Sequence, residues 1–181
     1  MNRRVTRVLV LGLAVATFLS FVVTACGDDD KGGVETIGDS SSASVSGEPA
    51  GPGVVEPKPA NVTNQVNVTL KEWAIATDRQ TVPAGDIYFL VDNQGPDDPH
   101  EFVIIKSNLA VDKLPTSNGK VPEDKVDLID EIEPFTPNSK AGETFNLKPG
   151  KYVLICNIAE VEDGKLESHY QLGMRTTLTV E

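Results

Sequence analysis

Short segments of alternating apolar residues, separated by turn signals, fill residues 65–181. Pro83-Ala84-Gly85 and Lys148-Pro149-Gly150 are two such signals, because proline and glycine break helices and strands. Alternation with a period of two indicates half-buried strands. We predict strands at residues 66–70, continuing through Trp73 and Ile75, and at 86–91, 101–105, 143–147, 151–155 and 175–180. Many short strands with little helical periodicity predict an all-β fold, an antiparallel sandwich or barrel.

One long charged insertion, residues 107–140, interrupts this pattern. We predict a short helix at residues 121–129, because Pro122 suits the first turn of a helix. An excursion of this length in a compact sandwich usually covers a sheet edge or a functional site. We assign Trp73 to the core, with a redox-relay role as the alternative.

The first 25 residues have the pattern of a secretory signal peptide. Arg3, Arg4 and Arg7 precede an apolar run that ends at Val23, too short for a comfortable membrane span. The sequence Val23-Thr24-Ala25-Cys26 resembles the bacterial lipobox, in which the cysteine is lipidated and becomes the new N-terminus. We therefore predict lipidation at Cys26 and an extracytoplasmic protein anchored in the cell membrane. The alternative is a signal peptide with a free cysteine, or an uncleaved anchor.

Residues 26–64 are predicted to be the lipidated cysteine and a flexible linker. From Gly27 the stretch is rich in Gly, Asp, Ser, Ala, Pro and Glu and contains no aromatic residue. Such a segment buries too little apolar area to offset the entropy of ordering it. A short strand within it is the alternative. The folded domain is then residues 65–181.

Charge and rare residues exclude several classes of function. The formal net charge is −11, with 16 Lys and Arg against 27 Asp and Glu, so no basic patch for nucleic acid is expected. Two cysteines exclude a disulfide framework. Two histidines are too few for a multicopper or dinuclear enzyme, and no nucleophile with a general base stands out. We therefore predict a protein that is not an enzyme.

The soft and imidazole donors after Cys26 are His100, Cys156, His169 and Met174, and each falls at a strand end or in a loop. Two imidazoles and one thiolate make a trigonal site, to which a thioether can add a long axial bond. Zinc would accept the first three donors but gains little from the thioether. Met174 therefore favours copper.

The order of these residues resembles that of the cupredoxins, the blue-copper family of plastocyanin, azurin, rusticyanin and sulfocyanin. The matching segments are Pro99-His100-Glu101-Phe102, Tyr152-Val153-Leu154-Ile155-Cys156-Asn157 and His169-Tyr170-Gln171-Leu172-Gly173-Met174. The resemblance implies a Greek-key β-sandwich and one type 1 copper ion held by the four donors. It also leaves the Glu101 backbone N–H free to bond the Cys156 sulfur. The 12 residues between Cys156 and His169 depart from the much shorter loop of the small family members.

The expected function is one-electron transfer by a membrane-tethered copper protein. The alternative is a lipoprotein that stores or delivers copper without redox turnover, although His-rich and Met-rich tracts are missing from the sequence. Acidic residues flank the donors at 92, 97 and 98 and at 160, 162, 163 and 167. We expect them to crowd one rim and to receive a basic redox partner, such as a cytochrome or a membrane oxidase. The alternative is that they only keep the domain soluble.

Overall fold

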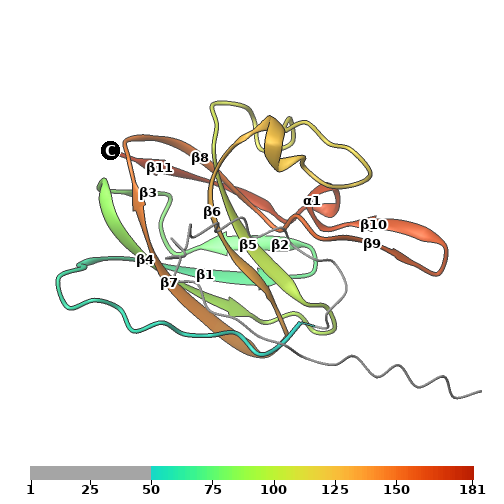
Figure 1. The fold of residues 1–181 in the computed structure, drawn as a ribbon, viewed down its shortest axis with the longest axis horizontal. Helices are drawn as coiled ribbons and strands as arrows, with labels where there is room; N and C mark the ends of the chain where they lie inside the picture. Colours follow the sequence, from blue (N-terminus) through green and yellow to red (C-terminus); the bar gives the residue numbers. More distant parts are fainter. Residues whose placement is uncertain (1–49) are drawn as a thin grey trace, which may run out of the picture. The chain divides into compact units, whose positions relative to one another are not determined.

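The computed structural model describes residues 50–181, where the predicted strands assemble into two sheets that pack face to face (Figure 1). The first sheet has the order β2-β1-β4-β7. Its strands are β1 (Asn64–Lys71), β2 (Ala74–Thr77), β4 (Gly85–Asn93) and β7 (Ser139–Leu147). β1 pairs parallel with β4, and the other two pairings are antiparallel.

The second sheet has the order β3-β11-β8-β5-β6. Its strands are β3 (Thr81–Val82), β5 (His100–Lys106), β6 (Asp127–Phe135), β8 (Gly150–Ile155) and β11 (Arg175–Val180). β3 runs parallel to β11, whereas the remaining neighbours are antiparallel. The predicted all-β sandwich is confirmed, and its sheets are mixed because β1 and β3 each join a parallel neighbour.

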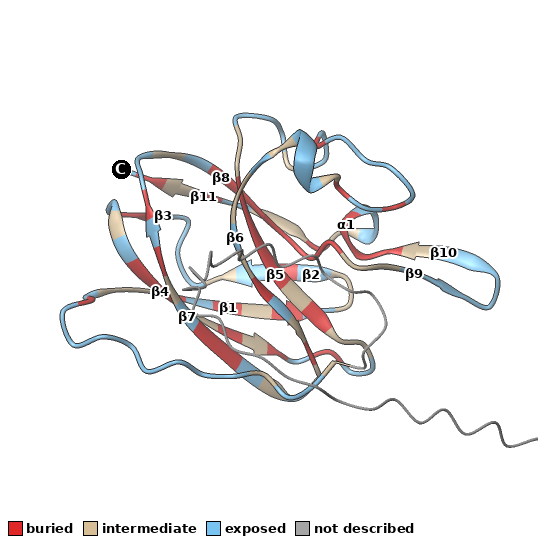
Figure 2. Ribbon diagram, viewed as in Figure 1, coloured by how far each residue is buried: buried red, intermediate tan, exposed pale blue. Residues whose placement is uncertain are grey.

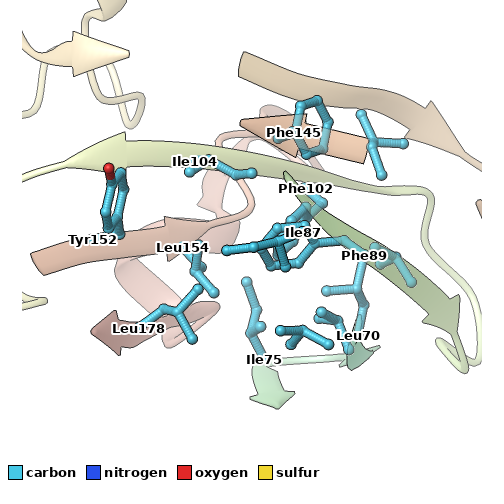
Figure 3. Close-up of a cluster of buried hydrophobic side chains, with 14 of the residues drawn as sticks. Leu70, Ile75, Ile87, Phe89, Phe102, Ile104, Phe145, Tyr152, Leu154 and Leu178 are labelled. Atoms are coloured by element: carbon cyan, nitrogen blue, oxygen red, sulfur yellow. The ribbon is translucent and has the colours of Figure 1, made fainter. Parts of the chain in front are cut away.

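The core lies between the two sheets (Figures 2 and 3). Apolar side chains alternate toward it along each strand, as the period-two pattern requires. The following residues are among its members: Leu70, Ile75, Ile87, Phe89, Phe102, Ile104, Phe145, Tyr152, Leu154 and Leu178. Cys156 and Met174 belong to this same buried cluster, so one end of the core merges with the predicted metal site.

The insertion differs from its prediction. The helix expected at residues 121–129 is only a single 3-10 turn, η1 (Glu123–Lys125), and Asp127 already begins β6. The strand forms because β5 supplies antiparallel partners along its length. The preceding part of the insertion packs on the outer face of the second sheet, where Leu114 and Val121 join a second buried cluster with Val153.

The turn between β1 and β2 is a second difference. Lys71 pairs with Ala74, so the segment that was predicted to continue through Trp73 instead folds back on itself at Glu72 and Trp73. A further β-hairpin, β9 (Ala159–Glu162) and β10 (Lys165–Ser168), fills most of the long loop after Cys156. It extends away from the two sheets and leads into α1 (His169–Leu172) (Figure 1).

Residues 50–63, which were expected to belong to the linker, run along the sandwich. Gly51 and Val55 form parallel bridges with Phe135 and Gly142, and Val62 is buried. The ordered domain therefore begins before residue 65. The predicted signal peptide, Cys26 and the rest of the linker lie outside the described residues. Within residues 50–181 no helix has the length and hydrophobicity needed to cross a membrane.

Candidate metal centre

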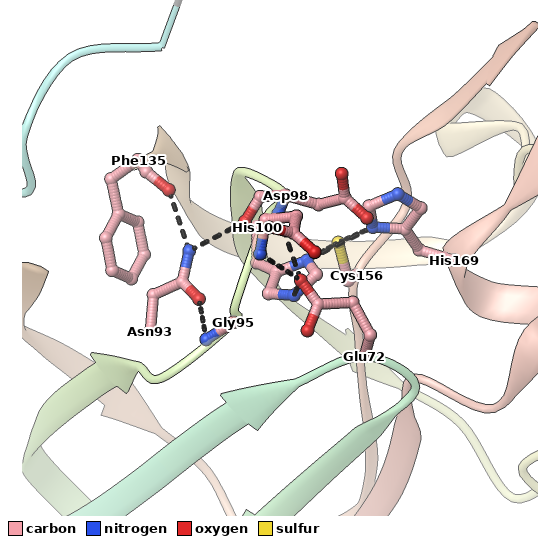
Figure 4. A network of polar contacts seen from close by, with 9 residues as sticks. Glu72, Asn93, Gly95, Asp98, His100, Phe135, Cys156 and His169 are labelled. Atoms are coloured by element: carbon pink, nitrogen blue, oxygen red, sulfur yellow. Dashed lines mark hydrogen bonds and ion pairs between the residues drawn. The ribbon is translucent and has the colours of Figure 1, made fainter. Parts of the chain in front are cut away.

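Three of the predicted donors meet at one point inside the protein. His100 Nδ1 lies 3.2 Å from His169 Nδ1, and the Cys156 sulfur lies 4.0 Å and 3.3 Å from these two nitrogens (Figure 4). All three residues have an exposed fraction of 0%. The arrangement matches the predicted trigonal set of two imidazoles and a thiolate.

Neighbouring strands of the second sheet bring His100 and Cys156 together. His100 is the first residue of β5, and Cys156 directly follows β8, which pairs with β5. His169 is the first residue of α1, and the Ser168 hydroxyl caps this helix by accepting the Gln171 N–H at 3.2 Å. The three donors therefore come from element ends, where the backbone is fixed on one side by regular hydrogen bonding.

The fourth predicted donor, Met174, is also fully buried and is tied to two of the others through its backbone. Its carbonyl accepts the Cys156 N–H at 3.1 Å, and its own N–H donates to the His169 carbonyl at 2.9 Å. The chain thus places all four predicted donor residues at the same end of the core.

The loop before His100 is held by the buried side chain of Asn93 (Figure 4). Its amide donates to the carbonyls of Phe135, at 3.0 Å, and Asp98, at 3.3 Å, and its oxygen accepts the Gly95 N–H at 2.9 Å. Asn93 therefore fastens the loop to β6 and helps to set the position of His100.

The donor set fits a metal ion better than it fits an empty core. Metal ions of this class bind imidazole nitrogen at about 2.0 Å and thiolate sulfur at about 2.3 Å, so donors around one ion lie roughly 3–4 Å apart. The observed separations agree with this range. The two Nδ1 atoms and the sulfur are buried and converge on one another. A cation bound between them would give these three donors a shared partner, which buried polar atoms require.

The surroundings of Cys156 keep its thiol protonated until a metal arrives. Burial raises the pKa of Cys156, and the nearby Glu101 carboxylate raises it further. Hydrogen bonds from the backbone N–H groups of Glu101 and Ile158 to the sulfur act in the opposite direction. The same two hydrogen bonds will partly neutralise the thiolate when a cation binds it.

The two imidazoles are held in the neutral form that binds metals. Burial lowers the pKa of His100, and burial with the adjacent His100 lowers the pKa of His169 to about 4. Carboxylates stand behind both rings: Glu72 Oε1 is 3.7 Å from His100 Nε2, and Asp98 and Glu167 gather near His169. Carboxylates near metal-binding histidines commonly fix the orientation of the imidazole ring.

Sequence reasoning did not identify how the donors are supported. It placed Glu72 and Trp73 in a strand, with a redox-relay role for Trp73 only as the alternative. It gave Asn157 no role beyond its place in the segment that contains Cys156. The Asn157 amide accepts the Val121 N–H at 2.6 Å and donates to the Val121 carbonyl at 2.9 Å. The Ser168 hydroxyl donates to the Gly119 carbonyl at 2.5 Å. Together these bonds fasten the insertion to both ends of the loop that carries Cys156 and His169, as a covering role predicts.

Comparison with known proteins gives structural similarity alone. No protein-family model and no curated protein matches the chain. The chain is similar to a dithionite-reduced auracyanin from Roseiflexus castenholzii, with 24% identity, a TM-score of 0.47, and 66% of this chain and 98% of that chain covered. An azurin from Methylomonas sp. strain J shows 19% identity and a TM-score of 0.47, with 66% of this chain and 99% of that chain covered. Auracyanin A, a "blue" copper protein from Chloroflexus aurantiacus, shows 23% identity and a TM-score of 0.44, with 65% of this chain and 98% of that chain covered.

The class of the protein follows from its own fold and side chains. Two packed sheets place two imidazoles and a thiolate around one buried point, and Met174 sits in the same end of the core. A thiolate with two imidazoles and a thioether nearby is the donor chemistry of copper that changes oxidation state. The chain therefore has an all-β sandwich whose buried donor set suits one copper ion, as the resemblance to the cupredoxins implies.

Proposed function

We propose that this protein is a one-electron carrier rather than an enzyme, with His100, Cys156, His169 and Met174 as its copper ligands. The observation that supports this most is the complete burial of the donor set at the end of a rigid sandwich, with an exposed fraction of 0% for each residue. Copper held there supplies a change of one electron between its two common oxidation states. Met174, buried at the same end of the core, would supply a weaker thioether donor.

Access to the site suits electron transfer better than bond chemistry. On residues 50–181, neither the surface pocket beside Pro52 and Pro134 nor the one beside Lys106 and Pro149 is lined by a donor, and all four donors are fully buried. A substrate that reacts at the metal would need an open coordination position and a path to it. An electron needs neither.

The chain contributes a fixed geometry to this function. β5 and β8 hold His100 and Cys156 through their ladder, and the Met174 carbonyl accepts the Cys156 N–H. Donors that do not move when charge changes leave little structural reorganisation to slow the transfer. The N–H groups of Glu101 and Ile158 stabilise negative charge on the sulfur and so adjust the reduction potential.

The test is to add one equivalent of Cu(II) to the metal-free protein and to record the visible spectrum. We expect an intense thiolate-to-copper absorption that ascorbate bleaches and ferricyanide restores, with one electron counted for each copper. A copper delivery protein would instead lose the ion to a strong Cu(I) chelator within the time of mixing, because its site must open easily. Absorption that fails to appear, or that reduction destroys permanently, would refute electron transfer.

We also propose that Cys26 is lipidated and anchors the protein on the outer side of the cell membrane. The residues concerned lie outside the described part of the structure, so the lipobox-like sequence alone supports this. Cys26→Ala should release the protein from membranes while its copper spectrum stays the same, since stable anchoring needs two acyl chains. Retention of the variant in membranes washed with high salt would contradict the proposal.

A basic redox partner is proposed to dock at the β9–β10 hairpin. Glu160, Glu162 and Asp163 are exposed there, and on the other face Val161 and Leu166 pair across the strands with exposed fractions of 71% and 54%. Uncovered apolar side chains bordered by charge are typical of an interaction surface. The hairpin also connects directly to His169, which places this surface near the metal.

Salt dependence tests this docking. Changing Glu160, Glu162 and Asp163 together to the corresponding amides should slow electron transfer to a cationic cytochrome at low salt. The difference should fade as salt rises to about 0.5 M, because the screening length is already only about 10 Å at 0.1 M. A triple variant as fast as the wild type at the lowest salt would place docking elsewhere.

A further inference from the structure

None of the four donor residues is exposed to solvent, so a separate residue must connect the metal site to the surface for electron transfer. His100, Cys156, His169 and Met174 all have an exposed fraction of 0%. A partner therefore cannot touch any of the copper ligands. An electron that leaves or enters the site must cross at least one further side chain, and that side chain must reach both a ligand and the solvent.

Trp73 satisfies both conditions. Its indole packs edge-on against the His169 imidazole, with ring centroids 4.9 Å apart and planes inclined by 69°. The residue is only partly buried, at the turn between β1 and β2. Its aromatic system thus bridges the gap between a buried ligand and the surface.

This contact depends on the glycine that follows α1. Gly173 has a φ of +136°, and a Cβ atom on it would lie 2.7 Å from the Trp73 carbonyl oxygen. Only glycine therefore lets the turn approach the segment that links His169 to Met174. The position of the indole is built into the fold and does not result from a loose surface side chain.

The same turn carries an acidic border. Glu72 Oε1 accepts the backbone N–H groups of Asp97, at 3.2 Å, and Asp98, at 2.9 Å, which ties the loop before His100 to the turn. Asp97 is exposed, and Asp98 is partly so. A partner that approaches Trp73 meets negative charge, so a cationic redox partner is favoured there.

We propose that Trp73 is the port through which electrons pass between the copper site and its partner, an inference that rests on the proposed electron-carrier function. In each transfer the reduced protein loses one electron and the oxidised partner gains it, and no atom or proton moves. The indole stays neutral and serves as the bridge. His169, buried behind it, is the ligand that the electron crosses.

The chain offers a direct readout, because Trp73 is its only tryptophan. In the metal-free protein its fluorescence should be quenched by acrylamide, as partial exposure requires. One equivalent of Cu(II) should quench the fluorescence strongly, whereas Zn(II) should change it little, since Cu(II) bound at His169 offers an efficient quenching pathway at this distance. Full emission from a protein that shows the copper absorption would overturn the proposed contact.

The rate experiment uses Trp73→Leu and Trp73→Phe in the copper-loaded protein. Oxidation of the reduced forms by tris(phenanthroline)cobalt(III), a cationic one-electron acceptor, is followed by stopped-flow. We expect Trp73→Leu to react several-fold more slowly and Trp73→Phe to lie between it and the wild type. The visible spectrum and the reduction potential should stay near wild type in both, because neither residue is a ligand.

A matched control is Leu109→Ala, another exposed apolar residue, which lies beyond the far end of β5 from His100. It should react at the wild-type rate. If the Leu and Phe variants react at the wild-type rate and keep the copper spectrum, electron passage through Trp73 is refuted, whereas the proposed electron-carrier function is not. If Trp73→Leu does not fold, the Phe variant and the fluorescence decide the matter. A chain that binds no copper would end both proposals.

Discussion

The Asn157 side chain helps to hold the insertion to the metal site, and removing its amide should lower the stability of the domain. Its side chain makes two bonds to Val121, accepting the N–H at 2.6 Å and donating to the carbonyl at 2.9 Å. Asn157 and Val121 are both buried, with exposed fractions of 4% and 1%. In Asn157→Ala, the backbone N–H and carbonyl of Val121 lose their side-chain hydrogen-bond partner, and their burial keeps water from replacing it.

The size of the effect follows from these two groups. Each buried polar group left unsatisfied costs about 1–3 kcal/mol, so the pair should lower the free energy of unfolding by about 2–6 kcal/mol. A typical domain has about 5–15 kcal/mol in total. We therefore expect a large shift of the urea midpoint in the metal-free protein, measured by Trp73 emission and by circular dichroism.

Asn146→Ala is the control, because Asn146 also donates an amide hydrogen bond, to Asp86 at 2.6 Å, but on the exposed surface. It should change stability by no more than about 0.5 kcal/mol. If Asn157→Ala were as mild as this control, the amide pair would not be what fastens the insertion, and the reasoning would be wrong.

Three other substitutions probe the site and its surroundings. Cys156→Ser should abolish the visible absorption, whereas Met174→Gln should keep it with a changed potential, because the axial position tolerates a weak oxygen donor; an unchanged spectrum in the serine variant would disprove the ligand assignment. Gly173→Ala should lower the thermal midpoint of the metal-free protein, since its Cβ would lie 2.7 Å from the Trp73 carbonyl oxygen; an unaltered midpoint would count against this close approach. Burial, together with neighbouring carboxylates, raises the pKa of Glu131 from 4.5 to about 7, so ionising it costs more in the folded state than in the unfolded chain. That cost is absent below about pH 4.5, grows between pH 4.5 and about 7, and is constant above that, so Glu131→Gln should match wild type in urea at pH 4 and be more stable than wild type at pH 8. Equal stability at both values would contradict the raised pKa.

The strands and the donors could be predicted from the sequence because both signals are local. Residues such as Ile87 and Phe89 alternate with neighbours toward solvent, and this alternation survives wherever one face of a strand is buried. His100, Cys156, His169 and Met174 were recognisable because the folded domain holds so few residues of these types. Their chemistry pointed to copper before any geometry was known.

The edge strand and the hairpin could not be predicted in this way. β6 reads Asp127-Leu-Ile-Asp-Glu-Ile-Glu-Pro-Phe135, too charged to look like a strand, and it lies at the edge of its sheet. Its hydrogen bonds come from β5, which is distant in sequence. β9 and β10 are similarly acidic, and Ala159 and Ser168 at the base of their hairpin lie near Gly119 of the insertion. Pairing and docking decided these elements, because isolated two-stranded ribbons are at best marginally stable.

What the sequence by itself determined, then, is the set of donors and the strands that carry them. Only the tertiary structure decided what surrounds them: Glu72 behind His100, Trp73 against His169, and Asn157 bonded to the insertion. In the sequence an acidic residue in a turn looks like ordinary surface, and a tryptophan between strands looks like core. Their roles depend on contacts between segments far apart along the chain, and such contacts leave no periodic trace in the sequence.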